Sequence, residues 1–260
     1  MRKSGVTVLG AMLLPVFIAG CGGGGGDDGG SNPTPPAPAP TAEGVYGGTL
    51  TGSTGSAFEA LILESGEIWA LYGDDAGSIF QVYGFIQGQG TSNNGSFTAS
   101  DVRDFGYFPP VSGTLTATYN STAKTISGSA SADGMTVQFS GGPIPGSLYN
   151  YNAPASLSAV AGSWQVVSTT AESISINVTA SGSVTTSGSG CTSTGSITPR
   201  PSGKNVFNVS LTFGPAPCVL PNATARGIAV AYPLSTGQTQ LIAAVTDSSR
   251  TFGVAVFGIR

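Results

Sequence analysis

The sequence predicts an all-β protein: two tandem antiparallel domains, each a roughly eight-stranded barrel or sandwich. Three observations carry this prediction. Apolar and polar residues alternate with a period of two along many short segments, glycine-containing turn signals separate these segments, and only one short stretch looks helical. In this interpretation a signal peptide and a disordered linker precede the two domains.

The clearest alternation lies in NVFNVSLTF, residues 205–213. The Phe, Val, Leu and Phe at positions 207, 209, 211 and 213 fall on one face, and Asn, Ser and Thr fall on the other. Because successive side chains of a strand point to opposite faces, this segment predicts one dry face and one wet face. The same pattern occurs in SISINVTA (173–180), TLTATY (114–119) and MTVQF (135–139). The turn signals between such segments are Ser65-Gly66, Asn94-Gly95, Asp133-Gly134, Ser181-Gly182, Gly203 and Gly237.

The one helical stretch, APASLSAVAG at residues 153–162, also marks the expected domain boundary. GVYGGTLTG, beginning at Gly44, and GSWQVVSTT, beginning at Gly162, each start a pattern of Gly-x-aromatic strand, second strand, Ser-Gly turn and third strand. We therefore predict one β domain over residues 44–152 and a related one over residues 153–260.

Residues 1–20 have the layout of a bacterial signal peptide. A positive start at Arg2 and Lys3 leads into an apolar run and then small residues. The run is short for a membrane span of ~20 residues. The junction IAGC, residues 18–21, resembles the lipobox of bacterial lipoprotein precursors, which implies that Cys21 receives a diacylglyceryl group and becomes the mature N-terminus. Two acyl chains anchor a protein stably, so the lipid bilayer is the partner expected for Cys21. An ordinary secretory signal with a chance cysteine is the alternative.

A linker follows over residues 21–43. GGGGGDDGGSN is a flexible coil by composition, and PTPPAPAP, residues 33–40, favours extended polyproline II. In the lipoprotein family, a residue such as Gly22 rather than Asp after the cysteine accompanies transfer to the outer membrane. The expected location is therefore the cell envelope, with a lipid anchor in the outer membrane. The periplasmic and surface faces both stay open.

The body carries two further resemblances. A helical turn leading into Gly162-x-Trp164, in a chain that reaches Arg260, is similar to the lipocalin pattern, in which such a Trp begins the first strand and an Arg packs across it. In the first half, FTASDVRDF (97–105) and SGTLTATYNSTAKTISGS (112–129) resemble the small barrels of surface lipoproteins related to transferrin-binding and factor H-binding proteins. These resemblances imply barrels that bind a ligand or a protein.

The two remaining cysteines, Cys191 and Cys218, are an even pair in an exported chain and bracket the segment 205–213. This predicts a disulfide. Closing its loop of 28 residues would stabilise the fold by roughly 3.5 kcal/mol in the chain-entropy model. Two cysteines without a nearby histidine make a poor zinc site, so no metal site is expected.

The chain contains no histidine, which excludes Ser-His-Asp and Cys-His nucleophile systems and zincin motifs. STAK, residues 121–124, matches an S-x-x-K element but falls in an expected hairpin turn and has no S-D-N or K-T-G partner. The acidic candidates are Glu59, Glu64 and Glu67 flanking one predicted hairpin, Asp74 and Asp75 in the next turn, and a mixed cluster of Asp101, Arg103 and Asp104. We expect solvated turn charges there, or at most a weak calcium site, and assign no catalytic residue and no cofactor.

Charge is sparse and divided between the halves. The formal net charge is −4 and only 8% of residues are charged, so nucleic acid is not an expected partner. Residues 44–150 hold eight acidic and two basic residues, whereas 153–260 hold two acidic and five basic ones. These opposite signs predict either docking of the two domains or orientation of the second toward an anionic surface.

The function these features indicate is that of a non-enzymatic, membrane-anchored lipoprotein of the cell envelope. Its barrel mouths or loops would hold a small apolar ligand or an envelope or host protein. The aromatic loop DFGYFPP, residues 104–110, is the segment of most interest, although the sequence assigns no ligand-binding residue. A structural envelope component and a carboxylate-based hydrolase of envelope polymers are the alternatives.

Overall fold

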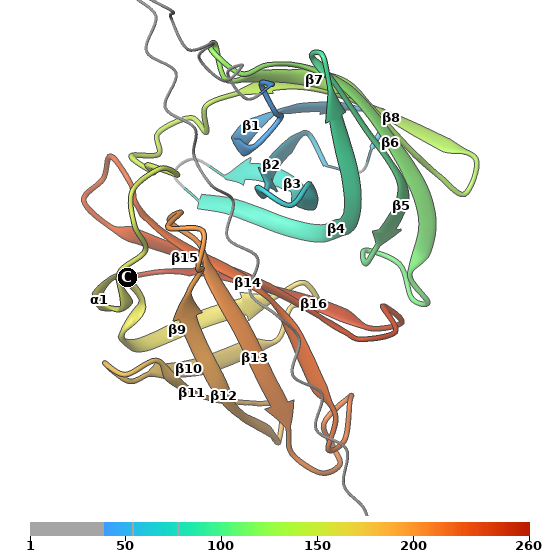
Figure 1. Ribbon diagram of the computed structural model, residues 1–260. Coiled ribbons are helices and arrows are strands. Elements are labelled where there is room, and N and C mark those ends of the chain that lie inside the picture. The colour runs from blue at the N-terminus through green and yellow to red at the C-terminus, as the bar shows by residue number, and fades with distance from the viewer. Residues whose placement is uncertain (1–38, 54, 77–78) are drawn as a thin grey trace, which may run out of the picture. The chain divides into compact units, whose positions relative to one another are not determined.

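The computed structural model describes residues 39–53, 55–76 and 79–260. It contains two closed antiparallel barrels of eight strands each, which confirms the all-β prediction and selects barrels over sandwiches (Figure 1). The predicted signal peptide (1–20), the lipidation site Cys21 and the linker up to residue 38 lie outside the described residues.

The first barrel is an up-and-down meander in which each strand pairs with the next along the chain. It closes where β1 pairs with β8, for example at Thr49 and Ser140. Its strands are β1 (Gly44–Thr51), β2 (Ala57–Ile62), β3 (Glu67–Ala76), β4 (Ile79–Asn93), β5 (Ser96–Asp104), β6 (Val111–Asn120), β7 (Thr125–Ala132) and β8 (Met135–Gly142).

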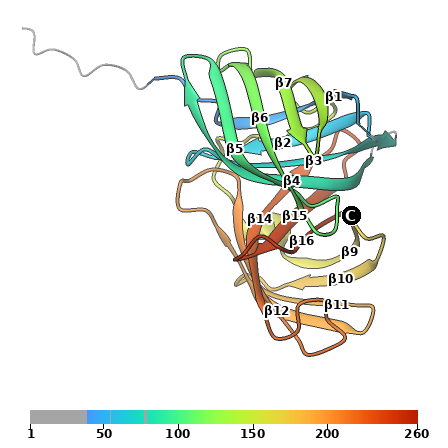
Figure 2. The same cartoon turned by 90° about the vertical axis from the view of Figure 1, so that its right-hand side faces the viewer.

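The second barrel repeats this meander and closes where β9 pairs with β16, at Val167 and Phe257 (Figure 2). The single helical turn α1 (Leu157–Val160) precedes it, inside the stretch that the sequence marks as helical. Its strands are β9 (Gly162–Ser168), β10 (Ser173–Val178), β11 (Ser183–Gly188), β12 (Cys191–Pro199), β13 (Phe207–Phe213), β14 (Thr224–Pro233), β15 (Thr239–Asp247) and β16 (Gly253–Ile259).

Tight hairpins account for the turn signals of the first barrel. Asn94 and Gly95 connect β4 to β5 with φ of 48° and 84°, and Asp133 and Gly134 connect β7 to β8 with φ of 48° and 75°. A two-residue hairpin turn of type I′ needs positive φ at both positions, and its twist matches that of the flanking strands. Asn-Gly and Asp-Gly meet that requirement, which is why these dipeptides mark the hairpins.

The barrels share an apolar core outside both of their interiors. The outward side chains of β2–β4 pack in one cluster with those of β14–β16. On β14, Ile228 and Tyr232 belong to this shared core, whereas Ala229 and Ala231 belong to the interior of the second barrel. These strands are therefore apolar on both faces, unlike strands with one wet face.

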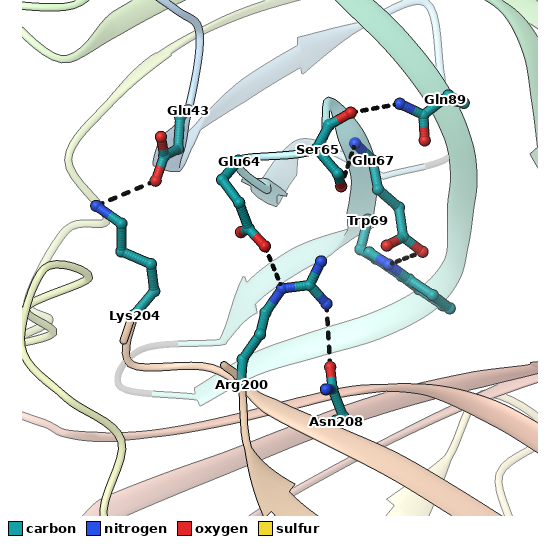
Figure 3. A network of polar contacts seen from close by, with 9 residues as sticks. All are labelled: Glu43, Glu64, Ser65, Glu67, Trp69, Gln89, Arg200, Lys204 and Asn208. Atoms are coloured by element: carbon teal, nitrogen blue, oxygen red, sulfur yellow. Dashed lines mark hydrogen bonds and ion pairs between the residues drawn. The ribbon is translucent and has the colours of Figure 1, made fainter. Parts of the chain in front are cut away.

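Ion pairs also connect the two halves of the described chain, and Figure 3 shows two of them. Arg200 Nε lies 2.8 Å from Glu64 Oε1, and Lys204 Nζ lies 3.1 Å from Glu43 Oε1. Arg250 Nη1 likewise lies 2.6 Å from Asp101 Oδ2. In each of these pairs the carboxylate comes from the first half and the cation from the second, as the docking interpretation of the charge division predicts.

Residues 39–260 consequently form one compact unit. The strands of the first barrel all precede the predicted boundary between residues 152 and 153, and those of the second all follow it. The division of the chain into two separate domains at that point stays a prediction, because the shared core covers an apolar face of each barrel.

Candidate ligand-binding cavity in the first barrel

The first barrel encloses a cavity of about 240 Å³. All eight strands contribute to its walls, which are mainly aliphatic and aromatic side chains. Small inward residues from three strands, Ala60, Ala70 and Ala130, leave space that larger side chains would fill. An eight-stranded barrel is just wide enough either to be filled by its own side chains or to hold one small ligand. The first barrel is hollow, because its own side chains leave this space unfilled.

One end of this barrel is closed by the segment that leads into β1. The hydroxyl of Tyr46 donates to the carbonyl of Ala42 at 2.8 Å, and that of Tyr119 donates to the carbonyl of Pro40 at 2.7 Å. The amide of Ala42 donates to Ser92 Oγ at 2.9 Å. Ala42 and Tyr46 are fully buried, and burial raises the pKa of the Tyr46 hydroxyl to about 12. The end of the predicted linker is therefore part of the barrel floor.

The opposite end of the barrel is open. The loop β5–β6 and the hairpin β7–β8 lie there, together with Gly52 and Ser53 after β1. Tyr107 and Met135 both line the cavity, yet 44% and 52% of their surfaces remain exposed. Phe108, next to Tyr107, is 86% exposed. The aromatic loop that the sequence singles out thus lies at the entrance to the cavity.

A hydrogen-bonded pair marks the polar side of this entrance. The hydroxyl of Tyr72 on β3 donates to Asp104 Oδ1 at the end of β5, at 2.8 Å, and the amide of Gly106 donates to the same oxygen at 2.8 Å. Both side chains line the cavity. Burial raises the pKa of Asp104 above its usual range, although the two hydrogen bonds oppose the shift. Burial and the neighbouring Asp104 raise the pKa of Tyr72.

The interior of the second barrel holds a core of buried aromatic and aliphatic side chains. Trp164 and Phe207 are buried there among aliphatic side chains. Trp164 Nε1 donates to the carbonyl of Val160 at 2.8 Å, and the Arg260 guanidinium lies 3.9 Å from the centre of the Trp164 ring. Arg260 Nη1 also donates to the carbonyl of Ala161 at 2.7 Å, which ties the end of the chain to the residue after α1. The packing of Arg260 across Trp164 is the one that the lipocalin resemblance implies.

The disulfide between Cys191 and Cys218 is present, with the two Cα atoms 4.7 Å apart. Cys191 begins β12, and Cys218 lies buried in the loop between β13 and β14. The bond therefore ties the loop after β13 to the strand before it.

Several charged residues lie elsewhere than the sequence predicts. Asp101, Arg103 and Asp104 lie within β5 rather than in a turn, and their side chains bond separately to Arg250, Ser112 and Tyr72. Alternation along β5 explains this, since neighbouring side chains point to opposite faces. Asp101 and Arg103 share the outward face, while Asp104 lines the cavity.

Asp74 and Asp75 lie within β3 rather than in a turn, paired with Gln81 and Phe80. Ser56 and Tyr83 donate hydrogen bonds to Asp74 and lower its pKa. STAK does form the predicted turn, between β6 and β7 at the closed end of the barrel.

The expectation that the acidic residues are solvated turn charges is wrong for Glu59. It lies on the outward face of β2, in the shared core, beside a second cavity of about 40 Å³. Its carboxylate accepts a hydrogen bond from the Tyr232 hydroxyl at 2.9 Å. Burial raises the pKa of Glu59 to about 7, with a smaller contribution from Asp75. The sequence signal was the apolar neighbours of Glu59 in AFEALI.

Within the three described ranges, no group of three or more His, Cys, Asp or Glu side chains is placed to hold a metal ion. The same part of the chain has no helix long and apolar enough to cross a membrane.

Comparison with known proteins gives distant structural matches only. No protein-family model and no curated protein matches the chain. A tryptophan-to-alanine mutant of the vaccine antigen transferrin binding protein B from Haemophilus parasuis Hp5 matches with 10% identity and a TM-score of 0.27, over 78% of this chain and 60% of that one. A protein of unknown function from Nostoc punctiforme PCC 73102 matches with 10% identity and a TM-score of 0.25, over 84% of this chain and 93% of that one. Similarity at this level carries no argument about function.

Proposed function

We propose that this protein is a non-catalytic bacterial lipoprotein, anchored through Cys21, whose first barrel binds a small apolar ligand. The observation that carries the proposal is the cavity of about 240 Å³, which has apolar walls, a plugged floor and an open mouth. Binding pockets are typically concave and mostly apolar, with a few placed polar groups, and Tyr72 and Asp104 are such groups here.

A cavity-filling variant tests the binding function. Ala70→Leu combined with Ala130→Leu adds volume to the cavity walls, whereas Ala123→Leu adds the same side chain in the exposed turn at the closed end. Decanol serves as a neutral apolar probe, followed by titration calorimetry. We expect the wild type and Ala123→Leu to bind decanol and the double variant to lose binding. If the wild type binds no decanol and native mass spectrometry finds no retained ligand, a structural envelope role is the better interpretation.

The anchor is tested separately by metabolic labelling with a fatty-acid analogue in a bacterial host. We expect the wild type to take up the label and Cys21→Ser to remain unlabelled. Protease treatment of intact cells then distinguishes a surface-facing body, which is digested, from a periplasmic one, which is protected. An unlabelled wild type would overturn the proposed lipid anchor and would leave the proposed ligand binding unaffected.

A protein partner is the second candidate, and one observation favours it. Phe108 is 86% exposed beside the cavity mouth, and large exposed aromatic residues are typical anchors of protein interfaces. A photo-crosslinking residue in place of Phe108 should then capture one specific envelope or host protein. The same crosslinker in place of Val219, which is 63% exposed in the second barrel, is the control.

A further inference from the structure

The size of the cavity limits the ligand. An apolar cavity of about 150 Å³ accommodates benzene, which has six carbon atoms. In proportion, the cavity of about 240 Å³ accommodates about ten carbon atoms, as in a short alkyl chain or a two-ring system. This inference rests on the binding function proposed for the first barrel.

The charges at the cavity are all negative. Asp104 and Asp133 are the charged residues in its described lining, which includes no lysine or arginine. Two further carboxylates, Asp74 and Asp75, lie near the end of β3, on the side of the barrel that opens. Two carboxylates therefore line the cavity itself, one at the end of β5 and one in the turn between β7 and β8.

The basic residues of the first half face elsewhere. Arg103 lies next to inward-facing Val102 and Asp104 on β5, and its guanidinium donates to Ser112 Oγ on the outward face. Lys124 lies in the turn between β6 and β7, at the closed end. Nothing in the described lining therefore offers a cationic partner to an anionic ligand.

Asp104 is the carboxylate that a bound ligand would meet with the least competition from water. It is partly buried against apolar walls, and Tyr72 and Gly106 both donate to its Oδ1 rather than to Oδ2. An ammonium group close to such a carboxylate gains from the low local dielectric, whereas a second carboxylate there is repelled and loses its hydration. Burial raises the pKa of Asp104, and a bound cation would lower it again.

We propose that the cavity selects cationic apolar ligands of about ten carbon atoms over anionic ones, with the cationic group held at Asp104 and Asp133. An alkylamine is the simplest member of this class. Neutral ligands of the same size bind through the walls alone, so their affinity falls between the two.

The test compares three probes of equal chain length on the full protein at neutral pH: decylamine, decanol and decanoate, each followed by titration calorimetry. We expect decylamine to bind at least tenfold more tightly than decanoate, with decanol between them. Asp104→Asn and Asp133→Asn should each reduce the ratio of decylamine affinity to decanoate affinity. Glu172→Gln removes the same charge from an exposed site in the second barrel and serves as the control.

The outcomes separate the two proposals. If none of the three probes binds, the binding function itself is wrong. If decanol binds but decanoate binds as tightly as decylamine, the binding function stands and the charge selection is wrong. The charge selection is equally wrong if the preference for the amine survives both aspartate substitutions. Should Asp104→Asn fail to fold, Asp133→Asn still decides, because Asp133 lies in an exposed turn whose positive φ asparagine also adopts.

Discussion

The hydroxyl of Tyr232 in the second barrel lies 2.9 and 3.1 Å from the two carboxylate oxygens of Glu59 in the first. The pair lies in the shared apolar core, and the three ion pairs between the two halves engage other carboxylates than Glu59. A buried carboxyl group without a neighbouring cation favours its neutral, protonated form. Burial accordingly raises the pKa of Glu59 to about 7. The contact between the barrels therefore contains a group that titrates near neutral pH.

This pair predicts that the contribution of Glu59 to the stability of the folded protein falls as the pH rises from about 4.5 to about 7. In the unfolded chain Glu59 releases its proton near its ordinary pKa of 4.5, whereas in the folded protein it keeps the proton until about pH 7. Between these values the folded state binds more protons, so the free energy of unfolding falls with rising pH, by about 3 kcal/mol in total. Above the folded pKa the loss is complete and constant.

Glu59→Gln should remove this dependence, because an amide can accept the Tyr232 hydrogen bond without a charge. Urea unfolding at pH 4, 6 and 8 measures it. We expect the variant to exceed the wild type in stability at pH 8 by up to about 3 kcal/mol, and to match it at pH 4. Equal stabilities at pH 8 would show that Glu59 is not held in a low-dielectric site.

Gly253 at the start of β16 allows the two barrels to approach closely. A Cβ atom there would lie 2.4 Å from Phe105 Cδ1 and 2.7 Å from Phe85 Cζ, in a stacked aromatic pair of the first barrel. Both rings are buried, so neither can move without disturbing the shared core. Gly253→Ala should therefore destabilise the protein by about 2 kcal/mol, measured by urea unfolding.

Gly142 at the end of β8 provides the matched control. The atoms nearest to a Cβ there lie at 3.8 and 3.9 Å, which is ordinary contact distance. Gly142→Ala should be neutral or slightly stabilising, because alanine restricts the unfolded chain more than glycine does. Similar losses in both variants would assign the effect to the substitution itself rather than to the contact between the barrels.

Removal of the disulfide should cost about 3.5 kcal/mol, because Cys191 and Cys218 close a long loop in the unfolded chain. The double variant Cys191→Ser, Cys218→Ser tests this by urea unfolding. The wild type in the presence of a reductant should lose the same stability. A loss in the variant without a loss on reduction would point to the buried serine at position 218 rather than to the cross-link.

The elements that the sequence predicts well are those specified locally. In β13, the alternation of apolar and polar residues predicts that Phe207 and Val209 are buried, and they are. Asn94-Gly95 and Asp133-Gly134 predict hairpins because few other dipeptides adopt positive φ twice in succession. Each of these signals depends only on neighbouring residues.

The contact between the barrels has a sequence signal that differs from strict alternation. The segments ARGIAVAYP (225–233) and LIAAV (241–245) carry apolar residues at nearly every position rather than at every second one. Such runs indicate strands buried on both faces. In β15, Leu241 and Val245 pack inside the second barrel while Ile242 and Ala244 face the first.

The cavity could not be predicted in this way. Whether a barrel is hollow depends on the summed volume of inward side chains from all eight strands, and that sum requires the registers of every pair. Only the closed barrels show that small residues such as Ala60 and Ala70 leave a cavity in the first, whereas Trp164 occupies the interior of the second. Tyr72 and Asp104 are 32 residues apart, so nothing local predicts their hydrogen bond.

The apolar core should contribute more than the ion pairs to the association of the two barrels. Arg200 and Glu64 are 15% and 34% exposed, and partly exposed pairs contribute about 1 kcal/mol or less. A double-mutant cycle with Arg200→Gln and Glu64→Gln should give a coupling energy in that range, whereas Leu61→Ala in the shared core should cost about 2–4 kcal/mol. Salt screens the ion pairs but not the apolar contacts. The free energy of unfolding should therefore change by less than about 1 kcal/mol between low and high ionic strength. If the coupling energy of Arg200 and Glu64 exceeded the stability loss in Leu61→Ala, the opposite charges of the two halves would instead be the main cause of their association.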